Sequence, residues 1–274
     1  MSETDITIRR MAFEFPADME LVFIRDDPAW SYFFLGSWMM LPYLEPYLMR
    51  SIRKAMDQTT DQALKEEMRR FCAQEGNHYK AHALANEVVR SRHPGFAKLK
   101  ELEAEIDAEF RAFSAGKSLR FNLAYAEGFE AMTSAMGRTQ FELDVFRDMA
   151  SPVRELVEWH VMEELEHRTV AFEAYEHVCG GYFYRLFRGI WAQWHYMRWG
   201  YRLAQCMLEA DGETVARHAH SAAESARVRR RFMWKALPKI LSIYMPWYSP
   251  RRIPLPAQFE AARQRYTAAA ASLG

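Results

Sequence analysis

Hydrophobic residues recur three and four positions apart along most of the chain, interspersed with alanine, glutamate and arginine. This spacing places them on one face of a helix and is typical of amphipathic α-helices. Alternating runs typical of strands are few, and the 274 residues include only 12 glycines. The pattern therefore predicts an all-α protein.

Prolines and turn residues divide this pattern into separate helices. Asp27 is expected to cap a helix that begins at Pro28 and is interrupted at Pro42 and Pro46. Thr60 or Asp61 is expected to cap the next helix. The later helices are expected from about 61 to 92, from 97 to 113, from 118 to an end or bend near Gly137, from 152 to 178 and from 182 to 209, with residues 237–256 mostly extended because of their prolines.

Two of the predicted helices carry the same short pattern, a glutamate followed three residues later by a histidine. Glu75 and His78 form one pair, and Glu164 and His167 form the other. Residues three apart share a helix face, so each pair can direct a carboxylate and an imidazole at one metal ion. Two pairs on separate helices indicate a metal site more strongly than one pair would.

Dinuclear carboxylate bundles use this pattern twice, with one further glutamate from each of two other helices. Glu45 and Glu127 are the candidates, because each is a lone charge in an apolar run. A buried carboxylate needs a partner, and a cation is a natural one. Glu130 is an alternative to Glu127, one turn away on the same side.

The heights of these glutamates provide a check. An antiparallel hairpin around residues 57–61 brings Glu45 and Glu75 to nearly the same level. In the second half of the pattern, Glu127 and Glu164 match only if the chain makes an additional bend near Gly137.

Other polar residues share the two helix faces. His82 extends the first pair and is included among the predicted ligands. His160 extends the second pair and is a candidate proton donor or hydrogen-bond partner of a ligand. Glu163 and Glu166 are alternatives to Glu164, although Glu166 is expected to face solvent.

Composition limits the partners and the setting. The 36 basic and 36 acidic side chains cancel, so no overall field attracts nucleic acid. Three cysteines without a CxxC pair argue against a disulfide framework or a cysteine zinc cluster. No signal peptide is evident at the first residues, so a cytoplasmic location is expected.

The chain resembles the bacterial family labelled "predicted metal-dependent hydrolase" over about residues 10–250, and its glutamate–histidine pairs resemble those of ferritin-like di-iron proteins. The segments that carry the resemblance are Phe23–Pro28, Gln74–His78 with His82, Trp159–His167 and Val170–Glu173. The resemblance implies a ferritin-like four-helix bundle with additional C-terminal helices. It also implies ligand roles for Glu45, Glu75, His78, Glu127, Glu164 and His167.

These observations lead to a division of the chain and a functional hypothesis. We expect an irregular segment (1–27), a metal-binding bundle (28–180) and aromatic-rich C-terminal helices packed on or beside it (181–274). The expected cofactor is two metal ions, most simply iron, with manganese or zinc as alternatives. Iron would make the protein an O₂-dependent oxidoreductase with an unknown electron donor, and the alternative is a dinuclear metal-dependent hydrolase.

Expected partners follow from the apolar composition. Sixteen methionines and 39 aromatic residues favour a small hydrophobic substrate. Residues 182–209 mix arginine with tryptophan, as helices at membrane surfaces do, so a peripheral membrane contact is one expectation. A homodimer is another.

Overall fold

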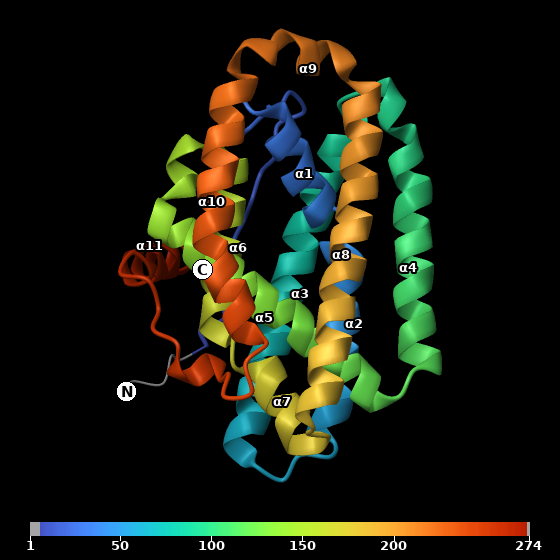
Figure 1. Ribbon diagram of the computed structural model, residues 1–274, viewed down its shortest axis with the longest axis vertical. Helices are drawn as coiled ribbons and strands as arrows, with labels where there is room; N and C mark the ends of the chain where they lie inside the picture. Colours follow the sequence, from blue (N-terminus) through green and yellow to red (C-terminus); the bar gives the residue numbers. More distant parts are fainter. Residues whose placement is uncertain (1–5, 273–274) are drawn as a thin grey trace.

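The computed structural model describes residues 6–272, which form a bundle of helices (Figure 1). Within this part of the chain there are eleven α-helices and no β-strand, and the only strand-like pairing is one antiparallel bridge between Ile24 and Met149. The all-α prediction is confirmed. The more specific ferritin-like topology stays a prediction.

Four helices lie together and supply the buried polar residues considered below. They are α2 (Leu41–Met56), α3 (Gln62–Ser91), α5 (Leu119–Leu143) and α6 (Val153–His167). Helices α2 and α3 form a hairpin, and α5 packs against both α2 and α6.

The remaining helices surround these four. Helix α8 packs on α1 and α5, α10 packs on α5, and α11 packs on α6 (Figure 1). Their bounds are α1 Pro28–Trp38, α4 Leu99–Gly116, α7 Val170–Val178, α8 Tyr182–Ala210, α9 Gly212–Arg217, α10 Ala222–Ile243 and α11 Phe259–Ala271, with short 3-10 turns at Pro94–Lys98, Val145–Asp148, Ala219–Ser221 and Pro250–Arg252.

The helix starts follow from side-chain caps. Asp27 accepts a hydrogen bond from the backbone N–H of Trp30 (3.0 Å), and Asp61 accepts one from Ala63 (2.8 Å). These bonds satisfy N–H groups that have no partner within the helix. The caps at Asp27 and Asp61 are confirmed.

Four predicted boundaries differ from the structure. The first helix is interrupted at Met39–Met40 rather than at Pro42 and Pro46, because Pro42 lies in the first turn of α2 and α2 continues through Pro46. Helix α5 continues through Gly137 to Leu143. Glycine at this position makes room for α6, because a Cβ there would lie 2.9 Å from a side-chain carbon of Val161. The predicted helix over 152–178 is two helices, because α6 ends at His167 and α7 begins at Val170. Residues 237–243 are helical rather than extended, since α10 continues through Pro238.

Close helix contacts hold α8 against the centre of the bundle. A Cβ on Gly128 of α5 would lie 2.3 Å from the Cα of Gly189 on α8, so glycine is required for this approach. Gly36 of α1 and Gly200 of α8 make a similar contact, because a Cβ on Gly36 would lie 2.4 Å from the carbonyl oxygen of Gly200. Small residues therefore position α8 beside both α1 and α5.

One apolar core runs through the described residues. It includes Leu44, Phe129 and Leu165 of the central helices together with Leu203 of α8 and Phe259 of α11. The division at residue 180 into a bundle and an added part stays a prediction. Among residues 6–272, no helix combines the length and the hydropathy needed to cross a bilayer.

Candidate metal centre

The four central helices bring buried glutamates and histidines to one place. All of the side chains concerned are buried. They are Glu45 from α2, Glu75, His78 and His82 from α3, Glu130 from α5, and His160, Glu164 and His167 from α6. The structure thus brings together both glutamate–histidine pairs that the sequence singled out.

One group of oxygens surrounds His167. Its Nε2 lies 3.3 Å from Glu75 Oε1, 3.4 Å from Glu130 Oε2 and 3.6 Å from Glu164 Oε2. Ligands that each lie about 2.1 Å from a shared cation are separated by roughly 3 to 4 Å. The spacing around His167 therefore suits a metal ion.

A second group lies beside the first. His78 Nδ1 is 3.6 Å from Glu75 Oε1 and 3.7 Å from Glu164 Oε1. Ligand atoms of Glu45, Glu75 and His78 also lie within 4.8 Å of one another. Glu75 and Glu164 each lie within 4 Å of both His78 and His167.

Many polar atoms at this point lack a hydrogen-bond partner. Both carboxylate oxygens of Glu45, Glu75 and Glu130 are buried without one, and so are His78 Nδ1 and His167 Nε2. A buried acceptor without a donor is costly, and a buried charge without a partner more so. Cations bound between these atoms would satisfy all of them together.

The opposite nitrogen of each imidazole is held by the protein. His78 Nε2 donates to Glu163 Oε2 (3.0 Å), and His167 Nδ1 donates to Gln74 Oε1 (2.9 Å). Each ring therefore turns its other nitrogen toward the carboxylates of the cluster. Metal-binding histidines are typically oriented in this way.

The N-terminal segment completes a layer outside the centre. Arg9 donates to Glu163 Oε1 (3.1 Å) and to Glu166 Oε1 (2.7 Å), and the amide nitrogen of Gln74 donates to Glu166 Oε2 (2.8 Å). The expectation that Glu166 faces solvent is therefore wrong, because its side chain is buried and pairs with Arg9. Glu163 and Glu166 already have partners, which leaves Glu164 as the carboxylate of α6 that faces the centre.

Electrostatics at the centre favour protons or cations. Burial raises the pKa of Glu45 and of Glu130, and the nearby carboxylate of Glu164 raises both further. Burial lowers the pKa of His78, but Glu163 and Glu75 outweigh it and raise that pKa to about 9. A divalent ion would displace protons from such a cluster.

Glu127 is placed differently from the sequence expectation. Its Oε1 accepts from Arg185 Nη1 of α8 at 2.9 Å, and it belongs to none of the groups around His78 and His167. Burial raises its pKa to about 7, although Arg185 acts in the opposite direction. Glu130, one turn further along α5, lies beside the cluster instead, with its Oε2 3.4 Å from His167 Nε2.

The position at which α5 ends explains why Glu130, rather than Glu127, lies at the level of Glu164. Glu130 lies 13 residues before Leu143, where α5 ends, and Glu164 lies 11 residues after Val153, where α6 begins. These separations correspond to about 20 and 17 Å along the two helices. The two carboxylates therefore reach nearly one level without the additional bend at Gly137.

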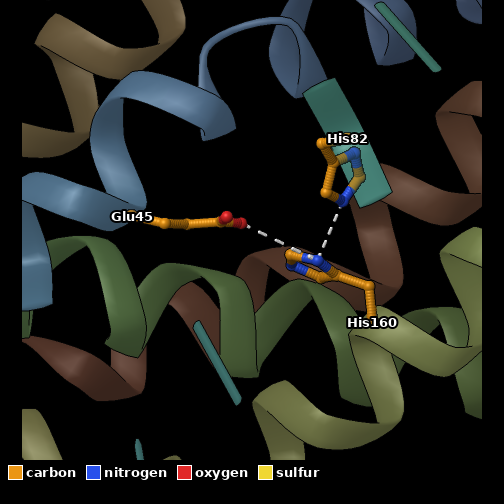
Figure 2. A group of neighbouring side chains, drawn as sticks. All are labelled: Glu45, His82 and His160. Atoms are coloured by element: carbon orange, nitrogen blue, oxygen red, sulfur yellow. Dashed lines mark hydrogen bonds and ion pairs between the residues drawn. The ribbon is translucent and has the colours of Figure 1, made fainter. Parts of the chain in front are cut away.

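His82 and His160 form a neighbouring group with Glu45 (Figure 2). His82 Nε2 lies 2.9 Å from His160 Nδ1, which is 3.9 Å from Glu45 Oε1. His160 Nε2 lies 3.1 Å from Glu164 Oε1. Figure 2 shows Glu45 and His82 pointing toward the ring of His160 from two sides. The three residues form either a hydrogen-bonded extension of the centre or a further place for a cation.

An apolar cavity of about 680 Å³ leads to this side of the centre. His160, Glu164 and Thr133 contribute polar groups to its wall, and Thr133 Oγ1 donates to Glu164 Oε2 at 3.0 Å. The rest of the wall is mostly aromatic and aliphatic, including Trp30, Phe34, Trp38, Phe129, Met132, Met136, Trp194 and Phe232. A hydrophobic small molecule would fit such a space.

The fold and the cluster define a class, namely all-α proteins with buried glutamate and histidine groups able to hold metal. The chain belongs to the family described as "predicted metal-dependent hydrolase", whose model matches residues 7–253. That description names a metal-dependent enzyme. Neither the curated proteins nor the solved structures gave a significant match to this chain.

Proposed function

We propose that this protein is an enzyme that holds two metal ions between α2, α3, α5 and α6 and hydrolyses an apolar small-molecule substrate. The unpartnered carboxylate oxygens and imidazole nitrogens of the buried cluster carry this proposal. The ligands we propose are Glu45, Glu75, His78, Glu164 and His167, with His82 as a further candidate. We add Glu130 because its Oε2 lies 3.4 Å from His167 Nε2 and neither of its carboxylate oxygens has a hydrogen-bond partner.

Family membership supports hydrolysis as the reaction class. Two bound cations would lower the pKa of a water molecule and polarise the bond to be cleaved. The cavity would admit an ester or amide of an apolar acid, with its polar group toward Glu164 and its hydrocarbon part along the aromatic wall. The hydroxyl of water joins the acyl carbon, and the alcohol or amine leaves with a proton.

We assign the movement of that proton to His160. This imidazole lines the cavity, and its Nε2 lies 3.1 Å from Glu164 Oε1, so a proton that the carboxylate takes from water can pass to Nε2 along this contact and return by the same route to the leaving group. His82 orients the ring through the 2.9 Å contact to Nδ1. Thr133 orients the carboxylate of Glu164 by its hydrogen bond.

Hydrolysis can be tested on protein stripped of metal and then loaded with zinc or manganese. The substrates are nitrophenyl esters with acyl chains from acetyl to dodecanoyl. We expect turnover that requires metal, disappears with a chelator and increases with acyl length until the cavity is full. A turnover rate that changes neither on addition of the chelator nor with the length of the acyl chain would contradict the proposal.

A second candidate is O₂-dependent oxidation of the same class of apolar substrate. The proposed ligand set favours it, because four carboxylates and two imidazoles from helices are typical of di-iron oxidoreductases. This reaction would need iron and an electron donor. An iron-loaded sample with a chemical reductant should then consume O₂ when an apolar substrate is added, and the zinc-loaded sample should not.

A further inference from the structure

Helix α8 exposes an uninterrupted apolar stripe. Its members recur three and four residues apart, and each is exposed to solvent. Residues three and four apart lie on one helix face. The stripe consists of Phe183, Phe187, Ile190, Trp194, Met197 and Tyr201, and no acidic residue occurs in α8 before Glu209.

Helix α10 combines exposed apolar residues with basic ones. A second apolar stripe consists of its exposed residues Val228, Met233, Trp234, Leu237 and Leu241. Its sequence holds six basic residues, Arg227, Arg229, Arg230, Arg231, Lys235 and Lys239, against one acid, Glu224. No acidic side chain among the described residues pairs with Arg230, Arg231 or Lys235.

The two stripes flank the mouth of the apolar cavity. Ile190, Trp194 and Met197 of α8 and Met233 of α10 both line the cavity and are exposed to solvent. Figure 1 shows α8 and α10 at the front of the molecule, joined across one end by α9. A surface that covered both stripes would therefore also cover the entrance to the cavity.

This face differs from the outer face of α4. The exposed positions there include Lys100, Glu101, Glu105 and Arg111, which carry both signs of charge. Exposed aromatic and aliphatic side chains beside unpaired basic ones are typical of helices that lie on anionic membranes. Basic residues close to such a membrane add electrostatic attraction to its anionic head groups.

We propose that the face formed by the two stripes docks on an anionic lipid bilayer, with Trp194 and Trp234 inserted at the interface. The mouth of the cavity then faces the acyl chains, so a molecule dissolved in the bilayer reaches it without crossing water. A second copy of the chain fits this face less well. Pairing the same face of two copies would bring the basic residues of both α10 helices together. The proposal does not depend on the reaction that takes place at the centre.

The test measures binding of the purified full-length chain to vesicles by co-sedimentation. Wild type is expected to bind vesicles that contain phosphatidylglycerol and to bind pure phosphatidylcholine weakly. The double variant Trp194→Glu/Trp234→Glu, which changes two exposed side chains, is expected to lose about tenfold or more in binding. Arg230→Glu/Arg231→Glu should lose a similar factor on the anionic vesicles alone.

Leu84→Glu is the matched control, since Leu84 is also exposed but lies on α3, away from both stripes. It should bind as wild type does, and thermal unfolding of all variants shows whether they are folded. Equal binding of wild type and both double variants would overturn the proposal. Failure of the wild type to bind anionic vesicles would also overturn it. A third contrary result is a wild-type dimer that the tryptophan substitutions convert to monomers with no change in vesicle binding.

Discussion

The buried carboxylates of the central helices fall into two groups, and protein side chains satisfy only one of them. Glu163 and Glu166 of α6 accept hydrogen bonds from Arg9, and Glu127 of α5 accepts one from Arg185. Glu75 and Glu130 face the same interior with no hydrogen-bond donor for either oxygen. Some buried carboxylates are thus satisfied within the fold, whereas those of the cluster are able to hold a cation.

Energetics supports this distinction. Removing one partner of a buried ion pair costs about 3 to 5 kcal/mol, because an uncompensated charge remains. The unpartnered cluster accumulates such a penalty several times over unless protons or cations are bound. Metal binding should therefore stabilise the folded chain, as it does wherever the folded state alone offers the site.

The largest effect is expected for Glu75→Ala. Among the carboxylates of the cluster, this one lies nearest to the inward-facing nitrogens of both imidazoles, 3.3 Å from His167 Nε2 and 3.6 Å from His78 Nδ1, so its removal should eliminate both ions and all turnover. Metal content by mass spectrometry provides the measurement. Glu66→Ala, an exposed position on the same helix, is the control and should retain about two ions per chain. Unchanged metal content in Glu75→Ala would contradict the account, because the unpartnered carboxylates would then not be needed to hold metal.

Substitutions on α5 sharpen the comparison within one helix. We expect Glu130→Gln to lose about one ion per chain and to remain folded, because its carboxylate belongs to the cluster. We expect Glu127→Gln to keep its metal and to lose about 3 kcal/mol of stability, since it weakens the partner of buried Arg185. Metal analysis and denaturant unfolding of both variants separate these effects. The opposite assignment of the two effects would show that Glu127 is the ligand.

The smallest effect is expected outside the cluster. Glu163→Gln weakens the acceptor that orients His78, and loss of such a partner typically reduces metal affinity about 10- to 100-fold. The control is Glu158→Gln on the same helix, where the glutamate pairs with Arg265 at the surface. Competition with a chromogenic chelator measures both affinities. Equal affinities would mean that the hydrogen bond to His78 has no influence on the centre.

Local signals in the sequence predict much of the fold. Helical spacing predicts the all-α class, and the caps at Asp27 and Asp61 are evident from residue type. The boundaries at Gly137 and Pro238 were wrong because packing decides them. Gly137 admits Val161 of α6 instead of ending α5, and α10 tolerates Pro238 within an exposed segment.

The candidate site is predictable in part. The two glutamate–histidine pairs follow from spacing alone, and the structure brings their four residues together. The choice between Glu127 and Glu130 depends on where α5 ends, which the sequence did not reveal. Arg9 acts on Glu163 across 154 positions of the chain, and no local pattern marks a contact at that separation.

The most direct test of the buried centre is anomalous X-ray scattering from crystals of the protein purified without added metal. Data collected on either side of the absorption edge would locate each metal ion and identify the element. We expect two peaks about 3.5 to 4 Å apart, one beside His78 and one beside His167, with Glu75 and Glu164 between them. A cluster without any anomalous peak, with its carboxylates hydrogen-bonded to water or to one another, would contradict the central claim.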